Sequence, residues 1–501
     1  MKSFLRLFQV SIVLIAGVAL GCSQSSRLWE GERPVRIQIP TDPVTLDPTL
    51  AEDGLSLRLL SNSMEGLMRS DAEGNIVPGL ASEIDLNREG TVYRFKIKSD
   101  LKWSDGRPLR LEDFVTAFRR ARDPKVGAKL AHFLDPLVDG DRAVRLEGDQ
   151  LIIELKRRTA HFLGVLTLPL TFPLREDVLQ SSQGKWPENG PSIGKYILTE
   201  QKRDQWVKMK PREGVKGLPI DWIIVRDEST ALALYESGKL DVVSRVPALD
   251  ISRLDAKGEI RRDPFLANYY LGFTVKHPEL RTSERRRALS RAIDRRTLVQ
   301  LTGGDDIADA NWLPQGLVDR GQVGAVSVSG PLSRSPFGKE AGVALELRFD
   351  SSSKNQAIAE RVQAEWLQQL GVKTRLVAMD WKSHIGSLKT DPPAVFRMGW
   401  MTPFKDPLPH LKAMTSKSPY NYTGWSNADY DRLVDEIESM PTNAERNLKV
   451  LQAEKILIDQ EAVIAPLFQA VLVHAVKPGI RGFLSNPFGL VDLSKIERVT
   501  K

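Results

Sequence analysis

The chain has 501 residues, of which 27% are charged and 41% are hydrophobic, and its formal net charge is +7. This length predicts two or three domains, and the composition is that of a globular protein rather than a disordered or fibrous one. The single cysteine, Cys22, excludes an intramolecular disulfide and a thiolate zinc site. The basic clusters are scattered over predicted helix and strand ends, which argues against a nucleic-acid-binding face.

Residues 1–21 have the form of a secretory signal, because basic residues precede an apolar run that is too short to span a membrane. The run ends in Ala-Leu-Gly before Cys22, which resembles a bacterial lipobox with Ala19 in place of the usual leucine. The resemblance implies lipid attachment at Cys22. An ordinary cleaved signal with a chance cysteine is the alternative. Residues 22–33 are then a polar tether.

Residues 91–124 predict a strand, a turn and a helix in close succession. Apolar side chains alternate with basic ones through residues 93–98, which is the period of a half-buried strand. Gly106 ends a Trp-Ser-Asp-Gly turn, where it is free to take a positive φ. An apolar stripe with helical spacing follows over residues 111–118, and Pro124 ends the helix.

The rest of the chain carries further periodic segments. They predict strands at 35–39, 151–155, 240–243, 265–273, 343–349 and 372–377, and helices at 229–235, 288–301, 359–370 and 430–437. Residues 343–377 have the order strand, helix, strand, so a parallel pair with a right-handed crossover is expected. Gly371 is the expected left-handed residue after the helix.

The segment 91–124 resembles a known family, the large extracytoplasmic solute-binding proteins (family 5) of peptide-importing ABC transporters. The residues that fit the family's motif are Tyr93, Phe95, Lys102, Trp103, Ser104, Asp105, Gly106, Pro108, Asp113, Phe114, Arg119, Asp123 and Pro124. The resemblance continues in shorter motifs at 42–48, 292–295, 421–433 and 465–468. It therefore covers the chain from about residue 35 to about residue 483.

The resemblance implies a mixed α/β fold of the type II periplasmic-binding-protein kind, with two lobes, a hinge and a small domain inserted early. The expected division of the chain is a signal at 1–21, a tether at 22–33, a discontinuous lobe I of 34–51, 174–268 and 470–501, an inserted domain at 52–173, and lobe II at 269–469. Such a receptor closes its cleft on a solute. It catalyses no reaction and needs no cofactor or metal.

The same resemblance implies a set of ligand-binding residues. Residues 397–400 match a strand that lies in the family's ligand cleft, and backbone groups of this strand can add an extended peptide as a further strand. By this alignment the tryptophans line side-chain pockets and Arg397 reaches a ligand carboxylate; for the tryptophans, a place in the core is the alternative. The candidate ligand-binding residues are Asp42, Tyr270, Trp381, Arg397, Gly399, Trp400 and Met401.

One departure from the family bears on the ligand. Family members that bind free peptides have an aspartate for the peptide's α-amino group where this chain has Pro403. Proline can neither pair with an ammonium nor donate a backbone N–H, and a desolvated ammonium without a partner is costly. Either another acid serves, with Asp406, Asp42 and Asp380 as candidates, or the ligand lacks a free amino terminus.

Enzyme motifs are incomplete in this sequence. The six histidines do not have metal-ligand spacing, and the Ser-x-x-Lys at 351–354 lacks the companion motifs of serine enzymes, so a cap or turn is expected there. The glycines at 190–194 stand one residue too close for a phosphate loop, and Tyr196 replaces its magnesium-binding hydroxyl residue.

The sequence therefore predicts a lipid-anchored, extracytoplasmic, monomeric solute-binding protein that delivers an oligopeptide-like ligand to an ABC permease. It predicts no nucleic-acid partner. Three alternatives stay open: a receptor of the same fold that feeds a membrane signalling protein, a receptor for a non-peptide solute, and a serine hydrolase that uses Ser351.

Overall fold

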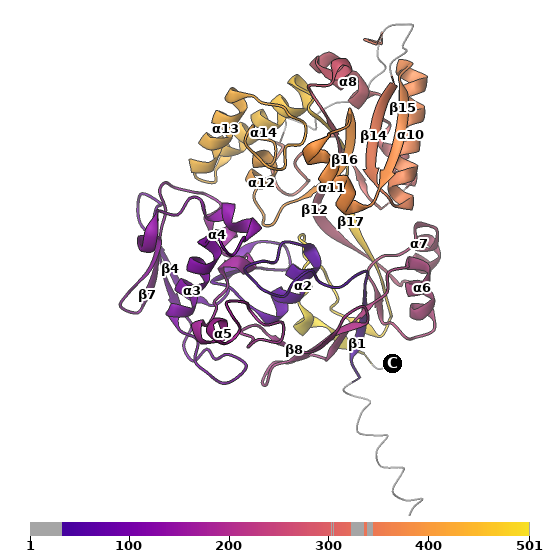
Figure 1. The fold of residues 1–501 in the computed structure, drawn as a ribbon. Coiled ribbons are helices and arrows are strands. Elements are labelled where there is room, and N and C mark those ends of the chain that lie inside the picture. Colours follow the sequence, from indigo (N-terminus) through magenta and orange to yellow (C-terminus); the bar gives the residue numbers. More distant parts are fainter. Residues whose placement is uncertain (1–32, 302, 304, 322–334, 338–343, 500–501) are drawn as a thin grey trace, which may run out of the picture.

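The computed structural model describes residues 33–301, 303, 305–321, 335–337 and 344–499. The predicted signal and the predicted lipidation at Cys22 lie outside these residues. Two lobes are evident (Figure 1), one with α2–α7 and the other with α8–α14. The first lobe has its main core from residues 35–242 and 476–496, and the second has its cores from residues 270–468. Among the described residues, none of the helices is long and apolar enough to cross a membrane.

The first part of the chain contains short helices and strands. They are β1 (Val35–Ile39), α2 (Gly54–Ser63), β2 (Met68–Ser70), β3 (Ile76–Pro78), β4 (Ala81–Leu86), β5 (Val92–Ile97), α3 (Leu111–Arg122), η1 (Lys129–Leu134), η2 (Gly140–Ala143), β6 (Val144–Glu147), β7 (Gln150–Glu154), α4 (Phe162–Val165), η3 (Pro169–Thr171), α5 (Glu176–Ser181), β8 (Tyr196–Lys202), β9 (Trp206–Pro211), β10 (Ile220–Ile224), α6 (Glu228–Glu236), β11 (Val242–Val243) and α7 (Ala248–Asp255).

The second part contains longer elements. They are β12 (Ile260–Phe273), η4 (Pro278–Leu280), α8 (Ser283–Arg291), α9 (Arg295–Leu301), β13 (Ile307–Ala308), β14 (Ala344–Asp350), α10 (Ser353–Leu370), β15 (Lys373–Met379), α11 (Trp381–Thr390), β16 (Val395–Met401), α12 (Leu408–Lys412), α13 (Ala428–Ser439), α14 (Ala444–Lys455), the π-helical η6 (Ile456–Gln460), β17 (Ile464–Val476), β18 (Ile480–Arg481), η7 (Leu493–Lys495) and β19 (Glu497–Arg498).

One large sheet runs through both lobes in the order β15-β14-β16-β12-β17-β11-β1-β10-β9-β8, with β13 beside β17. Its two longest strands, β12 and β17, are antiparallel and pass from one lobe to the other (Figure 1). Their register shifts between Pro264 and Asn268. Strand irregularities of this kind bend a ribbon locally, so this crossing connects the lobes as a hinge would. The predicted parallel pair at 343–377 is confirmed as β14 and β15, with α10 between them.

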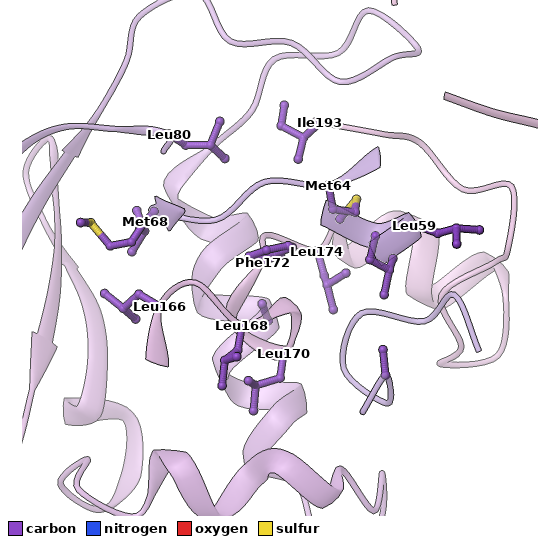
Figure 2. Close-up of a cluster of buried hydrophobic side chains, with 14 of the residues drawn as sticks. Leu59, Met64, Met68, Leu80, Leu166, Leu168, Leu170, Phe172, Leu174 and Ile193 are labelled. Atoms are coloured by element: carbon purple, nitrogen blue, oxygen red, sulfur yellow. The ribbon is translucent and has the colours of Figure 1, made fainter. Parts of the chain in front are cut away.

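The first lobe also carries a separate antiparallel sheet in the order β4-β5-β7-β6. This sheet lies within the segment predicted to be an inserted domain. Side chains of that segment share one core with the rest of the lobe: Figure 2 shows Leu174 and Ile193 of the lobe gathered with Leu166, Leu170 and Phe172 of the segment. The inserted segment and the lobe that holds it are therefore packed as one body.

The strand–turn–helix predicted for residues 91–124 is confirmed as β5, a turn and α3. Gly106 has a φ of +85°, which a residue without a Cβ adopts at no steric cost. The Asp113 carboxylate accepts hydrogen bonds from Trp103 Nε1 and from Arg110 N, both at 3.1 Å. The buried indole of the turn is thus bonded to the first turn of the helix, which fixes the two elements together.

The single helix predicted for residues 288–301 is wrong. The structure has α8, which ends at Arg291, and α9, which begins at Arg295. The Asp294 side chain accepts hydrogen bonds from Arg296 N and Thr297 N, as a residue at a helix start does. A local carboxylate cap therefore interrupts an apolar stripe that is otherwise continuous.

Three buried histidines make stability depend on pH. Burial lowers the pKa of His161 to about 4 and the pKa values of His410 and His474 to about 3. The folded chain keeps them neutral while the unfolded chain protonates them near pH 6.5, so stability present at pH 7.5 is lost as the pH falls. We expect each to lower the unfolding free energy by about 2 kcal/mol between pH 7.5 and 5.

Urea unfolding at the two pH values checks this expectation. His410→Leu should reduce the pH dependence by about 2 kcal/mol, because within the described residues neither ring nitrogen of His410 has a hydrogen-bond partner. His132→Leu, at an exposed position, is the matched control and should leave the pH dependence of the unfolding free energy unchanged. An undiminished pH dependence in the His410 variant would contradict the argument.

Candidate functional site

The second lobe has an open strand edge at β16. This strand lies between β12 and β14, but it pairs with β14 only at Val395 and Phe396. Beyond that point β14 continues along β15 as far as the pair Asp350 and Met379. No strand among the described residues therefore pairs with residues 397–401 on that side of β16.

Two hydrogen bonds show which backbone groups face the open side. The Arg397 carbonyl accepts from His384 Nε2 at 2.9 Å, so it points away from β12. Thr402 N donates to Leu266 O at 3.2 Å, so it points toward β12. Backbone groups of a strand alternate from residue to residue. The N–H and C=O groups of Gly399 and Met401 therefore point to the open side.

The open edge lies where three parallel strands end. β14, β15 and β16 end at Asp350, Met379 and Met401, and sheets of this kind bind ligands beyond the carboxyl ends of their strands. Trp381 is the first residue of the helix that follows β15, and its side chain is 55% exposed. The structure thus places Trp381, Gly399 and Met401 at one end of the sheet.

Aromatic side chains connect the edge to the first lobe. Trp400 and Tyr420 pack edge to face with ring centroids 5.0 Å apart, and Tyr420 lies 6.2 Å from the ring of His132 in the first lobe. The indole Nε1 of Trp400 is buried and has no hydrogen-bond partner among the described residues. Burial and then the nearby Glu52 carboxylate raise the pKa of Tyr420. Trp400, Tyr420 and His132 thus link the β16 edge to the first lobe through ring contacts.

Arg397 is 7% exposed and already neutralised. Its Nη1 donates to the Asp350 carboxylate at 2.7 Å, and its guanidinium lies 4.1 Å from the ring centroid of Tyr269. Its Nε is buried, and the part of the chain that the structure describes gives it no hydrogen-bond partner. The predicted contact with a ligand carboxylate would therefore have to compete with Asp350.

Two predicted ligand residues are not brought to the edge. Tyr270 is 2% exposed and packs against Trp312 in the second-lobe core, where burial raises its pKa. Successive strand residues point to opposite faces, and the neighbouring Tyr269 is the one that contacts Arg397. Asp42 accepts from Asp204 N, in the hairpin turn of β8 and β9 at the far end of the large sheet.

The loop after β16 contacts the first lobe through Phe404, which directly follows Pro403. Phe404 is fully buried, and its ring stacks on that of His161 with centroids 5.6 Å apart. It also meets the ring of Phe133 at 5.6 Å. A Cβ placed on Gly164 would come within 2.7 Å of the Phe404 ring, so only glycine leaves room there. Sequence periodicity gave no signal for this contact.

Ser351, the nucleophile of the hydrolase alternative, makes no side-chain hydrogen bond to a base among the residues that the structure describes. The next residue, Ser352, caps α10 by accepting from Asn355 N at 3.1 Å, as the cap prediction expected for this turn. The Lys354 ammonium donates to Asp306 at 2.6 Å. The motif is thus a helix start, and we find no observation that favours catalysis there.

A separate cavity of about 680 Å³ lies within the first lobe. It is lined by the end of α2, by residues 69–73 and by the C-terminal segment, which contributes Leu484. Glu65 and Lys195 also line it. None of the predicted ligand residues lines it. This cavity is an alternative ligand site, and a test of the β16 edge has to distinguish the two.

Comparison with known proteins shows which family this chain resembles. Residues 75–322 match the model of "Bacterial extracellular solute-binding proteins, family 5 Middle". The "Probable deoxycholate-binding periplasmic protein YgiS" of Escherichia coli is 27% identical over 89% of this chain and 90% of its own length. The "Dipeptide-binding protein DppE" of Bacillus subtilis is 25% identical over 98% of this chain and 99% of its own length.

Solved structures show the same fold. The murein tripeptide binding protein MppA of Escherichia coli has a TM-score of 0.79 at 24% identity and covers 94% of this chain and 99% of its own. The OppA of Haemophilus influenzae, in complex with RPPGFSPFR, has a TM-score of 0.79 at 21% identity and covers 95% of this chain and 100% of its own. The predicted two-lobed α/β fold is thereby confirmed. The chain is thus similar to the family 5 bacterial extracellular solute-binding proteins, whose model it matches over residues 75–322.

Proposed function

We propose that this chain is the lipid-anchored solute-binding component of an ABC importer. It would bind an oligopeptide-like ligand between its lobes and deliver it to the membrane permease. The observation that carries the proposal is the open edge of β16, where Gly399 and Met401 direct backbone donors and acceptors away from β12. An extended peptide can pair with such an edge without regard to its side-chain sequence.

The relatives support the peptide class of ligand. Their names describe dipeptide-, oligopeptide- and murein-peptide-binding proteins, and one describes a deoxycholate-binding protein. The family is one of binding proteins, several of them named as periplasmic, which supports an extracytoplasmic place and a non-enzymatic role. Anchoring through a lipid on Cys22 and a monomeric state rest on the sequence alone.

Native mass spectrometry of the protein from residue 23 onward, purified without denaturant, tests the ligand class. We expect co-purified peptides with a spread of masses. They should be released when the lobes unfold. A single non-peptide mass would keep the receptor and overturn the peptide class. For an empty preparation, a library of tetrapeptides is added, and absence of any bound peptide would overturn the proposal.

A further inference from the structure

Two basic side chains beside the open edge, Arg397 and Lys354, are paired with carboxylates of this chain. Arg397 binds Asp350 at 2.7 Å, and the side chains are 9% and 21% exposed. Lys354 binds Asp306 at 2.6 Å, and its ammonium lies 5.7 Å from the centroid of the Tyr269 ring, the same ring that Arg397 covers. Tyr269 is the register partner of Gly399. Arg397 and Lys354 are thus each compensated by a carboxylate within the chain.

The acids that could have replaced the one lost at Pro403 are also engaged. Asp406 is buried, accepts from Leu408 N and binds Arg446 at 2.9 Å. Asp380 caps α11 by accepting from Ser383 N at 3.1 Å. Asp42 accepts from Asp204 N at the far end of the sheet. A ligand ammonium would have to take one of these carboxylates from its present partner.

The first lobe holds one more ion pair, which lies beside Tyr420. Glu52 and Lys129 form an ion pair beside Tyr420, and their side chains are 33% and 70% exposed. An exposed pair contributes little to stability, so Glu52 is the carboxylate in this region that a ligand amine could capture at the lowest cost. Binding of a ligand ammonium by Glu52 is therefore the specific alternative to the proposal below.

We propose that the site at the open β16 edge selects peptide-like ligands whose two ends carry no charge, such as acylated, amidated or cyclic peptides. The inference rests on the proposed function, since it describes the ligand of the same site. Burying a charged terminus without a partner costs more than a hydrogen bond returns. A neutral amide end needs only hydrogen-bond partners, and the backbone groups of Gly399 and Met401 supply these along the open edge.

The test uses the ligand-stripped protein and an equimolar tetrapeptide library. One half of the library is left free, and the other half is acetylated and amidated with a mass tag. We expect native mass spectrometry to find the blocked half bound at least tenfold more strongly. Equal or stronger binding of the free half would overturn this inference and leave the proposed function standing. Binding of neither half would overturn the proposed function as well.

Two variants assign the result to the residues. Asp350→Asn releases Arg397, so we expect the preference for an amidated over a free carboxyl end to fall at least tenfold. Asp391→Asn is the matched control, because Asp391 is exposed and lies near Arg348 instead; it should leave that preference unchanged. Glu52→Gln tests the alternative: loss of binding confined to free-amine peptides would show that Glu52 holds an ammonium and would overturn the proposal. If Asp350→Asn does not fold, the library result with the natural chain decides alone.

Discussion

Replacing Asp47 by alanine is expected to lower the unfolding free energy of the first lobe by about 3–5 kcal/mol. Asp47 and Arg120 form a buried bidentate ion pair with both nitrogen–oxygen distances at 2.6 Å. Asp47 also accepts from Trp186 N at 3.1 Å. Removing the carboxylate leaves the Arg120 guanidinium buried without its counter-charge. Loss of one partner from a buried ion pair lowers the free energy of unfolding strongly.

Urea unfolding followed by tryptophan fluorescence measures this effect. Asp139→Ala is the matched control, since Asp139 is exposed and pairs with Lys156 at the surface at 3.2 Å. We expect the control to change the unfolding free energy by less than about 0.5 kcal/mol. Similar losses in the two variants would show that the buried pair contributes no more than a surface one.

Replacing Phe404 by alanine is expected to weaken the contact between the lobes. The fully buried ring contacts Phe133, His161 and Gly164, all in the first lobe, although Phe404 belongs to the loop after β16. Truncating a buried phenylalanine costs about 3–5 kcal/mol. Because β12 and β17 connect the lobes and Phe404 adds a contact between them, we expect its loss to favour an open arrangement, with a larger radius of gyration in X-ray scattering.

Phe114 provides the matched control for this experiment. It is also fully buried, but it lies within the first-lobe core. Phe114→Ala should lower the unfolding free energy by a similar amount and leave the radius of gyration of the folded protein unchanged. If the two variants scatter alike before unfolding, Phe404 does not hold the lobes together.

Local elements could be predicted from the sequence because they depend on neighbouring residues. The alternation at 93–98 and the helical stripe at 111–118 gave β5 and α3, and Gly371 ends α10 with a φ of +72° as expected. The apolar stripe at 288–301 misled because side-chain capping by Asp294 starts a new helix within it.

The site could be predicted only in part. The resemblance located the strand 397–401, but not that β14 leaves β16 after Phe396 and opens its edge. Strand alternation allows either Tyr269 or Tyr270 to face the site, and only the sheet pairing decides between them. The partners of Asp47, Arg397 and Phe404 are far away in the sequence, and no local pattern encodes such contacts.

The most direct test of the account is hydrogen exchange at single amides, with the co-purified ligand bound and after its removal. We predict that the bound ligand slows exchange at Gly399 and Met401, whose N–H groups face the open edge. Thr402, whose N–H already donates to Leu266 O, should not change. Unchanged exchange at Gly399 and Met401, with new protection around Glu65 and Lys195 at the first-lobe cavity, would contradict the assignment of the ligand to the β16 edge.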